Sequence, residues 1–94
     1  MSPKGGRTAA PPRGAAGDVA AALTAQETRS LQVRLCMGGR DVDGTWGPRT
    51  QAALALDRDF RKARGDRAAP LTSEEKTAYL GLTDAAAAGR CARR

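Results

Sequence analysis

The sequence predicts an all-α domain of three short helices that follows a tail without regular structure. A threonine stands three residues before a glutamate at Thr24 and Glu27, and again at Thr72 and Glu75. This spacing is the capping box of a helix start. Between the two boxes, Pro48 follows a glycine and suits the first position of another helix. The long alternation of apolar and polar residues that a strand needs is absent from the sequence. We therefore expect a small three-helix bundle.

The first 22 residues are expected to form a disordered tail or linker, which leaves residues 23–94 as the domain. Residues 1–18, MSPKGGRTAAPPRGAAGD, hold most of the prolines and, after Met1, no large apolar residue. A segment of this composition buries too little apolar surface to fold. The apolar run of residues 19–23 is too short for the core of an export signal. No signal peptide is thus visible, and we expect the chain to be a mature fragment or a module of a larger protein.

The first helix is expected at about residues 25–37. It begins after the cap at Thr24, and Leu31 and Leu35 recur on one face at helical spacing. The glycine pair at 38–39 offers the left-handed backbone conformation with which many helices end. This helix is therefore predicted to pack through its leucines and to stop at the glycines.

The second helix is expected to begin at Pro48 and to continue to about Ala63, with Gly65 as its stop. Leu56 and Phe60 are four residues apart and are predicted to lie on its buried face.

Charged residues are predicted to form the solvent face of this second helix. Asp57 precedes Arg61 by four residues, and Asp59 precedes Lys62 by three. Arg58 lies between the two aspartates. Opposite charges at these spacings form weak pairs on exposed helix surfaces. We therefore expect a row of solvated ion pairs.

The third helix is expected at about residues 73–81, where it buries Tyr79 or Leu80. Thr83 with the aspartate after it is suited to cap one further turn of alanines before Gly89. That turn would bring the end of the chain back toward the bundle.

The two cysteines, Cys36 and Cys91, are too far apart in sequence to form a zinc motif or a CxxC redox motif. If Cys36 ends the first helix and Cys91 follows the last, a disulfide would close a loop of about 56 residues. A bridge implies an oxidising compartment such as a bacterial periplasm or the cell exterior. We predict the bridge, with two unpaired thiols as the alternative.

The segment LQVRLCMGGRDVDGTWGPRTQAAL, residues 31–54, resembles the peptidoglycan-binding-like domain of bacterial wall hydrolases and related envelope proteins. In that family a helix ending in L-Q-x-x-L leads through a glycine turn to a D-G-x-aromatic-G-x-x-T corner, after which a second helix begins. The residues that match this pattern are Leu31, Gln32, Leu35, Asp43, Gly44, Trp46, Gly47, Thr50, Ala53 and Leu54. The resemblance implies a three-helix fold and a role in binding the cell wall.

The resemblance implies a shallow ligand site at the corner between the first two helices. A wall glycan or its stem peptide is expected to stack a sugar ring on Trp46. Asp43, Arg49 and Thr50 are expected to bond hydroxyls, amides or carboxylates of the same ligand. The same residues also suit a purely structural role as a turn, a core aromatic and a helix start. The sequence leaves both interpretations open.

The chain departs from this family in two places. Asp57 stands where the family usually has an aromatic residue, so we expect Leu56 or Phe60 to supply that core contact. The family's second D-G-x-x-G corner is replaced by ARGDRAAPLTSEE, residues 63–75. A domain can keep its fold after its binding site is lost. One alternative is therefore an interaction domain that keeps this fold and no longer binds the ligand.

The predicted function is a non-catalytic peptidoglycan-binding module that localises a larger envelope protein or hydrolase. The chain has no histidine, and no serine or cysteine has an evident base at a meaningful spacing. Residues 41–44 begin like a calcium loop, but its twelfth position is Ala52 and not a glutamate. We therefore expect no catalytic residue, no metal and no cofactor.

The net charge of +6 supports a rival function as a small basic nucleic-acid-binding protein. Binding to phosphates weakens steeply with salt, whereas recognition of a largely neutral glycan should not. We favour the cell wall because the charge is spread along the chain. No apolar run is long enough to cross a membrane, so we expect no membrane insertion and a periplasmic or extracellular location.

Overall fold

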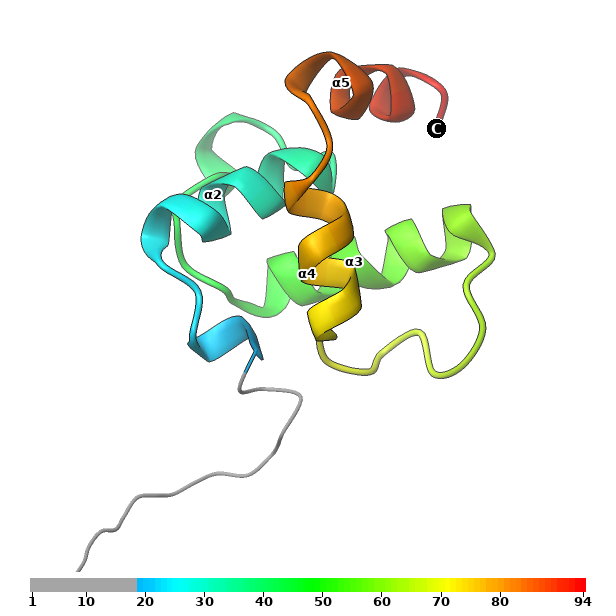
Figure 1. The fold of residues 1–94 in the computed structure, drawn as a ribbon, viewed down its shortest axis with the longest axis horizontal. Helices are drawn as coiled ribbons and strands as arrows, with labels where there is room; N and C mark the ends of the chain where they lie inside the picture. Colours follow the sequence, from blue (N-terminus) through cyan, green and yellow to red (C-terminus); the bar gives the residue numbers. More distant parts are fainter. Residues whose placement is uncertain (1–18) are drawn as a thin grey trace, which may run out of the picture.

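The computed structural model describes residues 19–94, and this part of the chain is all-α without a strand. Its elements are α2 (Ala25–Arg34), the short 3-10 helix η2 (Gly39–Asp41), α3 (Pro48–Arg61), α4 (Ser73–Leu80) and α5 (Asp84–Ala92) (Figure 1). Helix α2 packs against both α4 and α5. The predicted helices correspond to α2, α3 and α4, whereas α5 is a further helix where we expected a single turn.

The predicted helix starts are confirmed by their caps. The Thr24 hydroxyl accepts a hydrogen bond from the Glu27 N–H at 3.0 Å, and the Glu27 carboxylate accepts one from the Thr24 N–H at 2.9 Å. Thr72 and Glu75 repeat both bonds, each at 3.1 Å, before α4. Thr83 caps α5, which continues through the glycine at 89. Each start depends on residues within one turn, so local sequence is sufficient to place it.

The helix ends lie two or three residues before the predicted ones. Cys36 and Lys62 adopt left-handed φ angles of 68° and 57° after α2 and α3. In both places the next N–H bonds to the carbonyl five residues back, at 3.0 Å for Met37 and 2.9 Å for Ala63. These are Schellman endings, in which glycine is the usual left-handed residue. We had assigned the ends to glycines, and that assignment was wrong.

The predicted tail falls mostly on residues 1–18, which lie outside the described part of the chain. Residues 19–21, which we had included in the tail, form a helical turn. Val19 and Leu23 pack against the hydrophobic core. The packed body therefore begins before residue 23.

The core is small and formed mainly by leucines. Its fully packed members are Leu31, Leu35, Leu54, Leu71 and Tyr79. Tyr79 is buried, as predicted for the third helix. Leu56 and Phe60 are 55% and 41% exposed, so the prediction that either fills the core was wrong.

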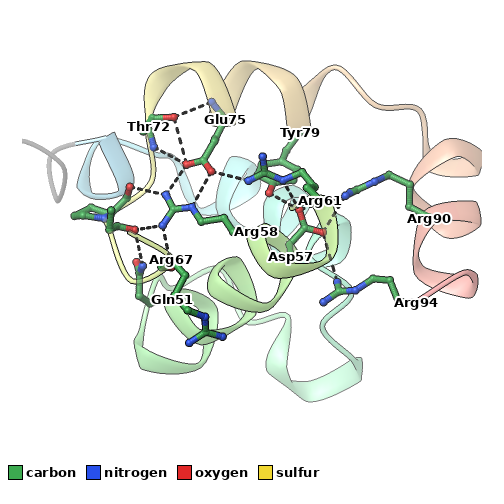
Figure 2. Close-up of polar contacts among 12 residues, drawn as sticks. Gln51, Asp57, Arg58, Arg61, Arg67, Thr72, Glu75, Tyr79, Arg90 and Arg94 are labelled. Carbon is green, nitrogen blue, oxygen red and sulfur yellow. Dashed lines mark hydrogen bonds and ion pairs between the residues drawn. The ribbon is translucent and has the colours of Figure 1, made fainter. Parts of the chain in front are cut away.

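The buried face of α3 is instead continued by charged residues, and Asp57 lies at its centre (Figure 2). Asp57 is completely buried. It accepts a hydrogen bond from the Tyr79 hydroxyl, one from Arg61 Nε at 3.0 Å and two from Arg90 Nη2 at 3.0 and 3.2 Å. Arg94 Nη1 lies 3.6 Å from the same carboxylate. Asp57 therefore joins α3, α4 and α5. The predicted pair with Arg61 is formed, but its carboxylate lies in the interior and not on the solvent face, while the Arg61 side chain is 32% exposed.

Glu75 forms a second ionic centre beside the first. It accepts hydrogen bonds from Arg58 at 2.7 and 2.9 Å and from Arg61 at 2.7 Å. Arg58 also donates to three carbonyls of residues 67–70, which fixes the loop before α4. Burial disfavours the charged carboxylate, but these bonds and one from Thr72 outweigh it and lower the pKa of Glu75 to about 2. This stabilisation is present above the ordinary glutamate pKa and is lost as the pH falls toward 2.

The single tyrosine gives a pH prediction. Burial disfavours the phenolate, and donation to Asp57 holds the proton, so both raise the pKa of Tyr79. In a spectrophotometric titration the folded protein should show no phenolate absorbance at pH 10, whereas the chain in denaturant should titrate near its ordinary value, about 10. A raised pKa makes the fold less stable once the pH exceeds the unfolded value. Phenolate formation at pH 10 in the folded protein would contradict the buried contact.

Cys36 and Cys91 lie at bonding distance, with 2.03 Å between the sulfurs, as the sequence predicted. The bridge joins the residues just after α2 to the last turn of α5. Because Arg90 and Arg94 flank this position, the bridge also holds them beside Asp57.

The bridge predicts the mass of the protein in its native compartment. Alkylation without reduction should add nothing to the intact mass, and reduction before alkylation should add two alkyl groups. Intact-mass spectrometry measures both. Two alkyl groups added without reduction would show free thiols and overturn the assignment.

Candidate functional site

The corner that the sequence pointed to is held by Gln32, which has no exposed surface. Its Nε2 donates to Asp43 Oδ1 and the Thr45 carbonyl, both at 3.0 Å, and to Thr50 Oγ1 at 3.1 Å. Its Oε1 accepts a hydrogen bond from the Gly44 N–H at 3.0 Å. One side chain of α2 thus holds both the loop at residues 43–45 and the first turn of helix α3.

Gly44 is required by this arrangement. Its φ of 80° is one that side chains rarely adopt, and an added Cβ would lie 3.3 Å from both the Ala25 carbonyl and the Arg29 side chain. A glycine at position 44 therefore lets the backbone of this loop lie close against α2.

Asp43 and Thr50, two of the predicted ligand-binding residues, make hydrogen bonds within the corner. Asp43 accepts from Gln32 and from the Thr45 N–H at 2.9 Å, and these bonds lower the pKa of its carboxyl. Thr50 is 2% exposed, and its hydroxyl lies 3.5 Å from the Gly47 N–H. Both side chains therefore shape the corner.

Trp46 lies beside a shallow groove of about 470 Å³. The lining residues are Ala20, Ala21, Trp46, Gly47, Pro48, Gln51 and Pro70. Trp46 is half-buried and packs against the core. Its Nε1 donates to Gln51 Oε1 at 3.4 Å, and Gln51 Nε2 donates to the Ala69 carbonyl at 2.9 Å. The indole is thus fixed in place while it lines an open, mostly apolar surface.

Arg49 is not among the residues that line this groove. Its side chain is 80% exposed, and Nη1 donates to Asp41 Oδ1 at 2.7 Å. An exposed pair of this kind is weak. Arg49 therefore remains accessible to a ligand that extends past Pro48, but the structure does not bring it together with Trp46 in one pocket.

Sequence reasoning missed the roles of Gln32 and Gln51. Helical spacing places Gln32 on the same face as Leu31 and Leu35, and the L-Q-x-x-L pattern includes it, but neither assigned it a hydrogen-bonding role, although a polar residue on a packed face indicates one. Gln51 gave no signal, because its partners at 68 and 69 lie in a loop whose position depends on Arg58.

The charges of the described region are largely paired. The arginine–carboxylate pairs are Arg34 with Asp84, Arg49 with Asp41, Arg58 with Glu75, Arg61 with Asp57 and Glu75, Arg67 with Asp59, and Arg90 and Arg94 with Asp57. Seven of the eleven arginines in residues 19–94 therefore already contact a carboxylate, which leaves fewer of them free to bind phosphates, although the net charge is unchanged.

Two further observations concern residues 19–94 only. No helix in this range is long and apolar enough to cross a membrane. In the same range, no cluster of three or more histidine, cysteine or acidic side chains is arranged to hold a metal. Comparisons of the chain with protein-family models, with curated proteins and with solved structures found no match.

Proposed function

We propose that this domain is a non-catalytic peptidoglycan-binding module and that the groove beside Trp46 is its binding surface. The observation that carries the proposal is a half-exposed indole on the wall of an open groove, which packs against the core, donates to Gln51 and follows the Thr45 carbonyl that Gln32 holds. A fixed aromatic ring loses little freedom when a ligand stacks on it.

The chemistry of the groove suits a glycan. Trp46, Pro48 and Pro70 offer flat apolar surface to the C–H face of a sugar ring. The Oε1 of Gln51 accepts one hydrogen bond from Trp46 and has a second lone pair for a hydroxyl or amide of the ligand. Arg49 is available to a carboxylate or hydroxyl further along the ligand. Asp43 and Thr50 contribute indirectly, because their hydrogen bonds hold the loop that carries Trp46. Glycan strands and stem peptides carry all of these partner groups.

The charge distribution favours a wall polymer over nucleic acid. A protein that binds phosphates needs cations that are free to replace counterions. In the described region most arginines already bond to carboxylates, and several of these pairs are part of the interior. The groove itself is lined by uncharged residues.

The proposed location is the periplasm or the cell exterior, where the wall lies. The Cys36–Cys91 pair at bonding distance supports an oxidising compartment. A module of this size would localise a larger envelope protein or hydrolase.

The proposal predicts that the protein co-sediments with purified bacterial wall sacculi at a salt concentration that abolishes binding to duplex DNA. Ala21→Leu, which fills the groove from an exposed position, should weaken sacculus binding at least tenfold. Arg49→Ala should weaken it several-fold and leave the unfolding midpoint nearly unchanged, because the side chain has little packing to lose. The fluorescence of the single tryptophan should also change when soluble wall fragments are added.

Two matched variants control this experiment. Ala22→Leu adds the same side chain at an exposed position that does not line the groove, and Arg93→Ala removes the same charge from the end of α5. Both should bind sacculi like the parent. If wall binding is absent at moderate salt while DNA is held with a steep salt dependence, the domain is a nucleic-acid-binding protein instead. If neither binds, it is an interaction domain without a wall site.

A further inference from the structure

A second pocket lies beside the buried ionic cluster, and none of its lining residues borders the Trp46 groove. It has a volume of about 380 Å³. The lining residues are Phe60, Arg61, Ala78, Tyr79, Leu82 and Arg90. It therefore combines two guanidinium groups with an apolar wall.

The ionic cluster next to this pocket has more positive than negative charge. Four arginines surround two carboxylates, Asp57 and Glu75, which leaves two positive charges in excess (Figure 2). Both carboxylates already accept bonds on each of their oxygens. A further anion would therefore meet uncompensated positive charge without displacing either carboxylate.

Arg90 supplies an unmet donor at the same place. Its Nη2 makes both bonds to Asp57, whereas its buried Nη1 has no hydrogen-bond partner among residues 19–94. The guanidinium lies 5.9 Å from the centre of the Phe60 ring. Phe60 is 41% exposed and is not part of the core, so the ring can shift to admit a ligand to the guanidinium and still form the apolar wall beside it.

We propose that this pocket binds a small monocarboxylate with an apolar body, the carboxylate between Arg61 and Arg90 and the body against Phe60, Ala78 and Leu82. Guanidinium groups bind carboxylates through paired, charge-assisted hydrogen bonds. The C-terminus of a peptide that ends in an apolar residue has this chemistry, and so does a free aliphatic or aromatic acid. The proposal is independent of the Trp46 groove.

The test measures the unfolding temperature of the whole protein with three probes at equal ionic strength: benzoate, N-acetyl-alanyl-alanine and the C-terminal amide of that peptide. A ligand that binds only the folded state raises this temperature with concentration. We expect millimolar benzoate to raise it and the peptide amide to leave it unchanged. A response to the free-acid peptide identifies a chain terminus as a ligand, whereas a response to benzoate alone identifies a free acid.

Two variants keep the test specific. Ala78→Leu narrows the pocket from an exposed position outside the ion pairs and should lower the affinity for benzoate at least tenfold. Ala88→Leu makes the same change at an exposed position of α5 that does not line the pocket, and it should bind normally. Equal stabilisation by the peptide amide, no response to either carboxylate, or full binding by Ala78→Leu would each overturn the proposal.

Discussion

Asp57→Asn should destabilise the protein by about 3 to 5 kcal/mol, the cost typical of removing one partner from a buried ion pair. Asp57 is fully buried, and the substitution leaves Arg61 and Arg90 beside a neutral amide. The amide also cannot accept on both sides, so the Tyr79 hydroxyl and one guanidinium compete for its single oxygen. Because the whole stability of a small domain is about 5 to 15 kcal/mol, this loss is a large fraction of it, and the urea concentration at the unfolding midpoint should fall in proportion. Urea titration followed by tryptophan fluorescence measures the loss.

Asp59→Asn is the matched control, because it makes the same change two residues further along α3. Asp59 pairs with Arg67 on the surface, where its side chain is 51% exposed. An exposed pair contributes little, so this variant should lose far less stability than Asp57→Asn. The double variant of Asp57→Asn with Arg90→Met should lose less than the sum of the two single changes, since one uncompensated charge is then removed. Equal losses at 57 and 59, or full additivity, would contradict a buried cluster centred on Asp57.

The sequence placed the helices of this protein better than it placed their contacts. Thr24, Thr72 and Pro48 mark helix starts through interactions within one turn, and each was predicted correctly. The ends at Arg34 and Arg61 were missed because Cys36 and Lys62 take the left-handed position that normally belongs to glycine. A left-handed residue other than glycine costs about 1 to 2 kcal/mol and leaves no mark in a local pattern, so the nearby glycines drew the prediction instead.

The buried face of α3 was missed for a related reason. Hydrophobic periodicity selected Leu56 and Phe60, but the packed face runs from Leu54 through Asp57 and Arg58. Charges at helical spacing indicate a solvent face unless partners on other helices are known. Here the partners come from α4 and α5, up to 37 residues further along the chain at Arg94.

The turn before Trp46 could be predicted from the sequence, but the hydrogen bonds that hold this turn in place could not. The Asp43-Gly44 pair and Pro48 indicate a turn that leads into a helix. Nothing in the sequence shows that Gln32 bonds to four residues of this corner, because the bonds cross 11 to 18 positions. The functional proposal rests on that support, since a loose corner would not hold the indole at the groove.

Gln32→Leu should destabilise the protein by about 2 to 4 kcal/mol and should also disorder the Trp46 groove. Leucine has nearly the volume of glutamine, so packing is largely kept, but the Gly44 N–H loses its partner. The buried Thr50 hydroxyl loses its shortest contact and keeps only two long ones of 3.5 Å, with the Gly47 N–H and the Thr45 carbonyl. Unmet buried polar groups cost about 1 to 3 kcal/mol each, and water can restore part of this at the exposed Asp43.

The measurement of this variant combines urea unfolding with tryptophan fluorescence and sacculus binding under native conditions. Released from the corner, Trp46 should emit at longer wavelength and be quenched more readily by iodide, and wall binding should fall even where the helices remain intact by circular dichroism. Gln26→Leu is the control, because Gln26 lies on the exposed side of α2 and has no side-chain hydrogen bond within residues 19–94. It should leave emission and binding unchanged. Were Gln32→Leu to retain normal Trp46 emission and full stability, the corner would be held by its turn and by Pro48 alone, and Gln32 would have no part in presenting the groove.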